Sequence, residues 1–330
     1  MKELKRVIKK YYKLLIVLII LGILLNIKFP YYIDTPGGTD NINKKIEIDG
    51  YKSKGSINSI YISEYDTTIP TLIMSLFKKN SKIISYKDAF LSNETIKDYE
   101  KRDKLFIEEA ISNAKYVGYT YSNSKIKIKS THIYILSISE EAKTNLKIGD
   151  EILKINNNII KSKEDINNII KSLNENDKLN IEVKNNKKTY NRTAEIIKID
   201  NENKIGILPG IINEYNLNPN IKVKIDKKES GPSSGFMMAL YIYNSLTKED
   251  ITKGRKIVGT GTIDMDGNIG IIDGVDMKLK SAVKAHADIF LVPNDKNYKE
   301  AIKIKNKYNY DIEIKGISTF TEAIEYLKNN

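Results

Sequence analysis

The pattern of apolar and polar positions divides the chain of 330 residues into four segments. The first segment, 1–33, holds an uncharged apolar run, Leu14–Ile27, between basic residues. Segments 34–121 and 122–200 mix strand-like alternation with amphipathic helical spacing, and segment 201–330 alternates short apolar strands with helices. The pattern predicts an α+β multidomain protein with an N-terminal single transmembrane helix.

The N-terminal segment is expected to be a membrane anchor. The run Leu14–Ile27 alone is too short for a hydrocarbon core of about 30 Å, so the predicted span extends from Tyr11 to Ile33. A cleaved signal peptide is the rival interpretation, but no small-x-small cleavage site follows the run. Basic residues before the span predict a cytoplasmic N-terminus and a single-pass cell-membrane protein whose residues from about 34 onward are extracellular. These basic residues are Lys2, Lys5, Arg6, Lys9, Lys10 and Lys13.

Segment 34–121 is expected to be an α/β scaffold without chemistry of its own. Strands are predicted at Lys45–Asp49 and Ile57–Ser63, and a short helix is predicted from Pro70 to Phe77. A longer amphipathic helix is expected from Asn93 to about Val117, because apolar residues recur there at helical spacing.

Segment 122–200 predicts a compact module of strands around one helix. Ser162-Lys163-Glu164-Asp165 has the form of a capping box, and Leu179, Ile181 and Val183 alternate as in a strand. Between the first strands and this helix stands Leu146–Asn156, in which Gly149-Asp150 predicts a turn. The order of these strands and the helix, together with the sequence of Leu146–Asn156, resembles a PDZ domain.

The resemblance implies that the module binds an extended peptide by strand addition. The Gly-rich loop with which PDZ domains hold a C-terminal carboxylate is not evident in Tyr119–Lys125. A PDZ fold that serves only as a spacer is the alternative.

The stretch that runs from Lys227 to Leu240 contains the first candidate for chemistry, Gly231-Pro232-Ser233-Ser234-Gly235. Pro232 suits the first turn of a helix, and the hydroxyl of Ser233 or Ser234 suits its N-cap. A hydroxyl beside unpaired backbone N–H groups suits a nucleophile whose product is an oxyanion. An ordinary capped helix and a Gly/Ser phosphate loop are the alternative interpretations.

A second passage contains a candidate base. Gly259–Gly270 predicts two short strands joined by the hairpin signal Asp266-Gly267. The helix expected at Val275–Ala287 places Lys278 in its first turn, where the helix dipole disfavours a cation. Apolar neighbours there favour a lowered pKa for Lys278, whereas a solvated helix lysine is the alternative. Ile289–Pro293 predicts a buried strand.

Together, the two passages resemble the proteolytic domain of Lon-type proteases, which are serine peptidases with a Ser-Lys dyad. The family's Gly-Pro-Ser-Ala-Gly motif corresponds to Gly231–Gly235, and its Thr-Gly-x-Ile hairpin with a following lysine corresponds to Thr260–Lys278. The resemblance implies that Ser233 is the nucleophile and Lys278 the general base, with Thr260 in support. Ser234 replaces the usual alanine, and Asp273 replaces the first glycine of a Gly-Gly turn.

Anchor, PDZ-like module and Lon-type domain together resemble the membrane-anchored PDZ-Lon proteases of Gram-positive bacteria. The sequence contains no Gly-x4-Gly-Lys-[Ser/Thr] phosphate loop. The resemblance therefore implies an ATP-independent serine endopeptidase that cleaves exported peptides or unfolded protein segments.

Composition narrows the chemistry. The chain has no cysteine, so thiolate nucleophiles and Cys-based metal sites are excluded, and we expect neither a metal nor a cofactor. The net charge of +12 is carried largely by interspersed lysines, which predicts no nucleic-acid binding. A Ser-His-Asp triad, the competing mechanism, would need His132 or His286. Competing functions are a non-catalytic membrane-anchored PDZ adaptor and a small-molecule kinase, and the oligomeric state stays open.

Overall fold

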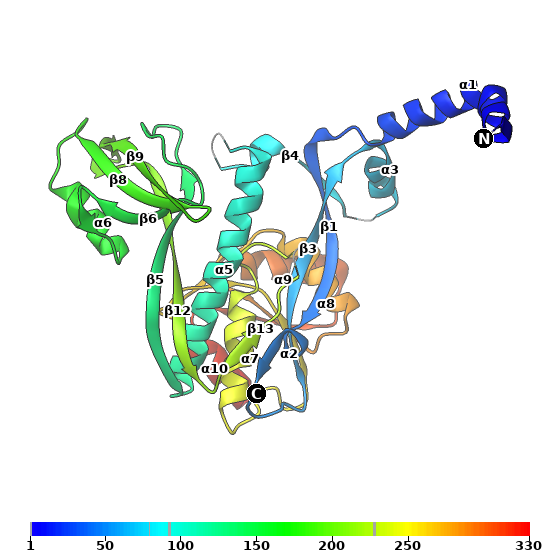
Figure 1. Cartoon of the computed structure of the whole chain (residues 1–330). Helices are drawn as coiled ribbons and strands as arrows, with labels where there is room; N and C mark the ends of the chain where they lie inside the picture. The colour runs from blue at the N-terminus through cyan, green and yellow to red at the C-terminus, as the bar shows by residue number, and fades with distance from the viewer. Residues whose placement is uncertain (1, 79, 92–93, 227–228) are drawn as a thin grey trace. The chain divides into compact units, whose positions relative to one another are not determined.

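The computed structural model describes the chain apart from a few residues: it covers residues 2–78, 80–91, 94–226 and 229–330 (Figure 1). Asn93, the expected start of the long helix, and Lys227 and Lys228, at the start of the candidate stretch, lie outside the described residues.

The chain forms two compact units. Unit 1 comprises residues 1–37 and 62–89, and unit 2 comprises residues 38–61 and 90–330. The strands β1 (Phe29–Asn41) and β3 (Ser56–Thr67) contribute residues to both units.

Unit 1 corrects the prediction of a transmembrane helix. Helix α1 runs over Lys2–Leu25, and the chain is already extended in β1 from Phe29, so the helix expected to reach Ile33 is wrong in extent. Pro30 explains the early end, because proline lacks the N–H that a helix needs and disfavours helical backbone in the residue before it. In the described part of the chain, no helix combines the length and the apolar character that crossing a membrane requires.

The rest of unit 1 is small. Strand β4 (Lys82–Ser85) pairs antiparallel with β1, and helix α4 (Tyr86–Ala89) follows it. Helix α3 (Ile69–Phe77) begins with a capping box formed by Thr68 and Thr71. The helix predicted from Pro70 to Phe77 is therefore confirmed.

A parallel sheet lies at the centre of the C-terminal part of unit 2. Strand β14 (Lys256–Gly259) pairs with β17 (Ile289–Pro293) on one side and with the first residues of β3 on the other, and β17 pairs with β18 (Glu313–Ile317). Ile289–Pro293 is the strand that the sequence predicts.

This sheet is buried on both faces. Ile257, Ile289 and Leu291 belong to the core that contains α7 (Gly235–Leu246), whereas Val258 and Phe290 belong to the core that contains α8 (Val275–Lys284). Successive side chains of a strand point to opposite faces, so the continuous apolar run of β17 supplies both cores. Helix α7, which follows the candidate serine, and helix α8, which carries Lys278, are thereby fixed to one sheet.

Shorter elements complete this part of unit 2. The hairpin of β15 (Thr262–Ile263) and β16 (Ile269–Gly270) forms at Asp266-Gly267, as predicted. The remaining elements are α2 (Ile42–Lys45), β2 (Ile46–Ile48), β13 (Ile221–Val223), α9 (Lys296–Tyr308) and α10 (Phe320–Asn329).

The other sheet of unit 2 has the order β12-β5-β6-β8-β9, with β7 beside β6. Its helix α6 begins after Ser162, whose hydroxyl and the Asp165 side chain form the predicted capping box. The elements are β5 (Lys125–Ile138), β6 (Glu151–Ile155), β7 (Asn158–Ile159), α6 (Lys163–Lys171), β8 (Lys178–Asn185), β9 (Lys188–Glu195), β10 (Ile197–Ile199), β11 (Glu202–Lys204) and β12 (Ile207–Asn218). β12 extends this sheet past residue 200, and the predicted domain limits stay predictions.

Helix α5 (Ile96–Tyr121) is the longest helix of the described chain and lies alongside the long strands β5 and β12 (Figure 1). It also packs against α7, and the two helices approach so closely that a Cβ on Gly118 would lie 2.7 Å from the Cβ of Ile242. α5 therefore contacts both the PDZ-like sheet and helix α7, which follows the candidate serine.

Candidate active site

The turn Gly231–Gly235 precedes α7 and is held by backbone hydrogen bonds at two points. The N–H of Gly231 donates to the carbonyl of Asp103 on α5 at 3.1 Å, and the N–H of Gly261 donates to the carbonyl of Ser233 at 2.9 Å. Gly231 has a φ of +78°, which other residues rarely adopt. Ser233 is partly exposed, so a substrate can reach it.

The predicted serine cap of this helix is wrong. α7 begins at Gly235, after Ser234, whose side chain makes no capping hydrogen bond. The helix needs no such cap at this point, because the N–H of Phe236 donates to the carbonyl of Gly261 at 3.1 Å. Pro232 lies in the turn before the helix.

The turn before the helix also presents two backbone N–H donors. Within the described residues, the N–H groups of Ser233 and Ser234 have no hydrogen-bond partner, whereas those of Gly231, Gly235 and Phe236 are all engaged. Two backbone donors are thus left at the position of the candidate nucleophile.

Lys278 is buried, with only 4 % of its surface exposed. Its ammonium donates to Thr260 Oγ1 at 3.2 Å, and the Thr260 hydroxyl donates in turn to the carbonyl of Ser233 at 3.2 Å. Thr260 is fully buried at the end of β14, where its N–H donates to the carbonyl of Leu291 at 3.1 Å. The three candidate residues therefore lie together, and Thr260 joins the lysine to the backbone of the serine.

Burial lowers the pKa of Lys278 from its ordinary 10.5 to about 8. The negative charge of Asp273 opposes this shift, because it favours the ammonium. Lys278 stands in the first turn of α8, after Gly274 with a φ of +70°, and this helix end disfavours a cation. The neutral amine is therefore accessible near neutral pH.

The two histidines lie elsewhere. Nδ1 of His132 lies 2.6 Å from Oε1 of Glu151 in the PDZ-like sheet, and His286 follows the end of α8 with a φ of +52°. Neither is hydrogen-bonded to Ser233 in the described part of the chain. A Ser-His-Asp triad thus finds no geometric support, and no group of acidic or histidine side chains among the described residues is suited to a metal ion.

Sequence reasoning missed the part that α5 plays at this site. Besides the Asp103 carbonyl on Gly231, the Asn113 side chain donates to the carbonyl of Ile263 in β15 at 3.0 Å. The only signal in the sequence was the amphipathic pattern of the helix, which does not say which segments it will contact.

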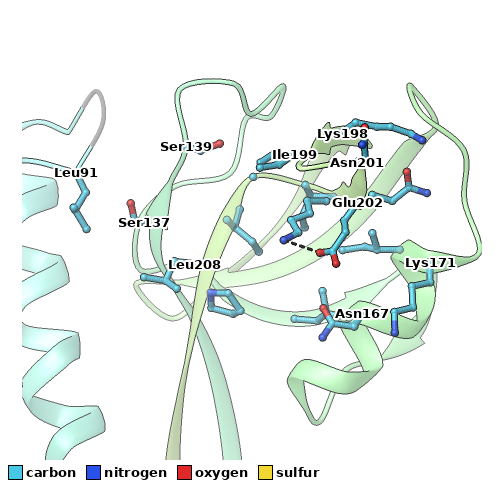
Figure 2. A pocket seen from close by; sticks show the side chains of 18 residues that line it. Leu91, Ser137, Ser139, Asn167, Lys171, Lys198, Ile199, Asn201, Glu202 and Leu208 are labelled. Carbon is cyan, nitrogen blue, oxygen red and sulfur yellow. Dashed lines mark ion pairs between the residues drawn. The ribbon is translucent and has the colours of Figure 1, made fainter. Parts of the chain in front are cut away.

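A groove of about 970 Å³ lies in the PDZ-like part, between α6, the β10–β11 hairpin and the start of β12. Its wall contains Ile166 and Ile170 of α6, which are buried, and Leu208 of β12, which is 45 % exposed. Figure 2 shows Lys171 on α6 and Lys198 on the hairpin, and a dashed line marks the ion pair that holds Glu202. The groove is apolar within and mostly basic at its rim.

Comparison with known families identifies two domains. The model of the PDZ domain matches residues 112–196, and the model of the Lon protease (S16) C-terminal proteolytic domain matches residues 220–329. A Lon protease from Campylobacter jejuni is 28 % identical over 117 residues, which cover 35 % of this chain and 14 % of that protein.

Two solved structures are similar to the PDZ-like part. The PDZ domain of an SdrC-like protein from Listeria monocytogenes is 26 % identical, covering 24 % of this chain and 90 % of that one, with a TM-score of 0.23. The second domain of another Listeria protein is also 26 % identical, covering 27 % and 88 %, with a TM-score of 0.20.

The chain is therefore a mixed α+β protein with a PDZ domain and a Lon-type proteolytic domain. The predicted enzyme class, a serine peptidase, is confirmed by the proteolytic domain and by the Lon protease relative. The catalytic roles of Ser233, Lys278 and Thr260 stay predictions. The hydrogen bonds described above give these predictions a defined geometry.

Lys278→Met should stabilise the protein at neutral pH. Below pH 8 both the native and the unfolded lysine are charged, so the native state bears the full cost of burying an ammonium. Between pH 8 and 10.5 the native lysine loses its proton first, and this cost falls as the pH rises. The gain should be on the order of 3 kcal/mol at pH 7 and smaller at pH 9.5. Thermal melts at both pH values test this prediction, with Lys280→Met as the control. An equal gain in stability at both pH values would show that the pKa of Lys278 is not lowered.

Proposed function

We propose that the chain is an ATP-independent serine endopeptidase that cleaves peptides or unfolded protein segments through an acyl-enzyme. Ser233 is the nucleophile, Lys278 is the general base, and Thr260 orients the lysine. The observation that carries the proposal is the buried Lys278, whose pKa is lowered to about 8 and whose ammonium is linked through Thr260 to the backbone of Ser233.

The proposed reaction begins with the neutral amine of Lys278, which takes the proton of the Ser233 hydroxyl as the oxygen attacks a peptide carbonyl. The free N–H groups of Ser233 and Ser234 can donate to the oxyanion that forms, and such a donor contributes about 3 kcal/mol. Protonated Lys278 then gives its proton to the leaving amine, and a water molecule hydrolyses the acyl-enzyme.

The proposal of ATP independence is supported by the sequence, since these 330 residues contain no Gly-x4-Gly-Lys-[Ser/Thr] phosphate loop. Without nucleotide-driven unfolding, the substrates would be peptides and segments that are already extended. The PDZ domain supports this substrate class, because such domains bind extended peptide segments.

Ser233→Ala and Lys278→Arg should each reduce peptide turnover by several orders of magnitude. Arginine stays charged at every accessible pH and cannot accept the serine proton, so Lys278→Arg tests the base and not the charge. Turnover of a fluorogenic peptide by the wild type should rise with pH and level off above about pH 8, as Lys278 loses its proton.

The matched controls are Ser234→Ala and Lys280→Arg, which should keep most of the activity. If Ser234→Ala were the inactive variant, the assignment within the Gly231–Gly235 turn would be wrong. Near-normal turnover by Lys278→Arg would exclude the Ser-Lys mechanism. A wild-type protein that neither cleaves peptides nor reacts with a fluorophosphonate probe would instead be the non-catalytic adaptor.

The groove should matter for protein substrates more than for short peptides. Leu208→Asp places a charge on an exposed apolar residue of the groove wall and should slow the cleavage of an unfolded protein severalfold. Cleavage of a short peptide should be unchanged. Ile159→Asp is the control, since Ile159 is 64 % exposed on β7 outside the groove. Equal effects of Leu208→Asp on both substrates would contradict the proposed binding role.

We also propose that the protein is attached to the cell membrane with its catalytic body outside the cytoplasm. Support comes from the apolar side chains of α1 that are exposed in the structure, such as Val17 at 58 % and Ile19 at 61 %, and from the basic residues ahead of them. Protease treatment of intact cells should digest the chain beyond residue 34, and the chain should sediment with membranes. A chain that is protected and soluble after lysis would overturn this location.

A further inference from the structure

A cavity of about 320 Å³ lies beside the candidate nucleophile, between α5 and the β15–β16 hairpin. Pro232, the residue before Ser233, forms part of its wall. Phe106 of α5 and Ile263 and Ile269 of the hairpin give it apolar sides. A peptide whose carbonyl is attacked by Ser233 would pass this cavity with a side chain near the scissile bond.

The charged residues that line the cavity are acidic, although the chain as a whole carries a net charge of +12. Glu109 and Asp264 line it, and none of its described lining residues is a lysine or arginine. Asp264 is occupied by its own turn, since it accepts the backbone N–H of Asn268 at 2.8 Å and the Asn268 side-chain amide at 2.8 Å. Glu109 is therefore the carboxylate that is left for a ligand.

Glu109 is held in place by one oxygen only. Its Oε1 accepts the N–H of Ile211 at 2.9 Å. The positive charge of Lys163 acts on Glu109 without a hydrogen bond to it in the described part of the chain, and it lowers the pKa of Glu109 by less than burial raises it. Burial raises the pKa of Glu109, because its carboxylate has lost part of its hydration. A cation that entered the cavity would compensate this loss, since charge-assisted hydrogen bonds are strong in partly buried sites.

We propose that this cavity is the subsite for a lysine or arginine side chain next to the scissile bond of the substrate, and that Glu109 determines this specificity. The aliphatic stem of such a side chain would lie against Phe106, Ile263 and Ile269, and its charged end would reach the second oxygen of Glu109. An apolar slot with a carboxylate at its end is also how trypsin selects basic residues. The inference rests on the proposed peptidase function.

Glu109→Gln is the informative variant. Glutamine can still accept the N–H of Ile211 through its amide oxygen, so the link between α5 and β12 is kept while the charge is lost. The purified full chain and the variant are each incubated with denatured casein, and the cleaved bonds are identified by mass spectrometry. Lysine and arginine should be enriched at one position near the cut, and Glu109→Gln should reduce that enrichment about tenfold. Glu100→Gln, an exposed position on the same helix, should leave it unchanged.

Other outcomes overturn the subsite. The subsite is contradicted if the bonds cleaved by the wild type show no enrichment of lysine or arginine near the cut. It is also contradicted if Glu109→Gln slows all cleavages equally, because a purely structural residue would have that effect.

Binding separates the subsite from the peptidase proposal. If the wild type cuts nothing, the peptidase proposal fails, and the subsite is tested by fluorescence anisotropy with Ser233→Ala. A labelled peptide with one lysine should bind this variant about tenfold more tightly than its norleucine analogue, and adding Glu109→Gln should abolish the difference. Equal binding of the two peptides would overturn the subsite.

Discussion

Burial of the Lys278 ammonium is the constraint around which the catalytic part of the chain is arranged. An ammonium among apolar side chains loses its hydration, and the described residues return a single hydrogen bond to it, from Nζ to Thr260 Oγ1. Thr260 can take this place because β14 ends directly before it and the Leu291 carbonyl fixes its N–H. The same hydroxyl donates to the carbonyl of Ser233, so one buried threonine links the proposed base to the backbone of the proposed nucleophile. The unfavourable burial is what makes the lysine useful as a base.

Helix α5 connects this site to strand β12 of the PDZ-like sheet by contacts along its first half and its middle. Near its start the Asp103 carbonyl holds Gly231, and further along Glu109 and Ser112 accept the N–H groups of Ile211 and Asn213 in β12. Pro209 has no N–H to offer, so this edge of β12 has few donors left for a peptide strand beyond its first residues. If a peptide adds to this edge of β12, as the proposed function implies, it can do so only along the part of the strand that forms the groove.

Local signals in the sequence predicted local structure well. The Ser162 capping box, the hairpin at Asp266-Gly267 and the strand Ile289–Pro293 each follow from a few neighbouring residues, and each is present. Two predictions failed for different reasons. Pro30 ends the first helix earlier than expected, and the carbonyl of Gly261, which is distant in sequence, accepts the helix N–H that a serine cap was expected to bind. The motifs single out Ser233, Thr260 and Lys278, which the structure places next to one another, and their catalytic roles stay predictions.

The role of Glu109 could not be read from the sequence, because its partner Ile211 is 102 residues away and nothing in the pattern of α5 distinguishes it from its neighbours. The N–H groups of Ser233 and Ser234, which have no partner among the described residues, also escaped prediction, because the sequence does not show which backbone groups of the turn find partners in distant segments.

Two opposing effects on the pKa of Lys278 explain how a chain with no cysteine and two remote histidines can still offer a candidate general base near neutral pH. With a pKa of about 8, roughly one lysine in ten is neutral at pH 7, compared with fewer than one in a thousand for an ordinary lysine. Deeper burial would raise the neutral fraction further, but a weaker base is less able to take a proton from a serine hydroxyl. Asp273 acts in the opposite direction, because its negative charge stabilises the ammonium and keeps the lysine more basic. Asp273, which replaces a glycine of the Lon motif, thus raises the pKa of the proposed base, whereas the burial of Lys278 lowers it by more.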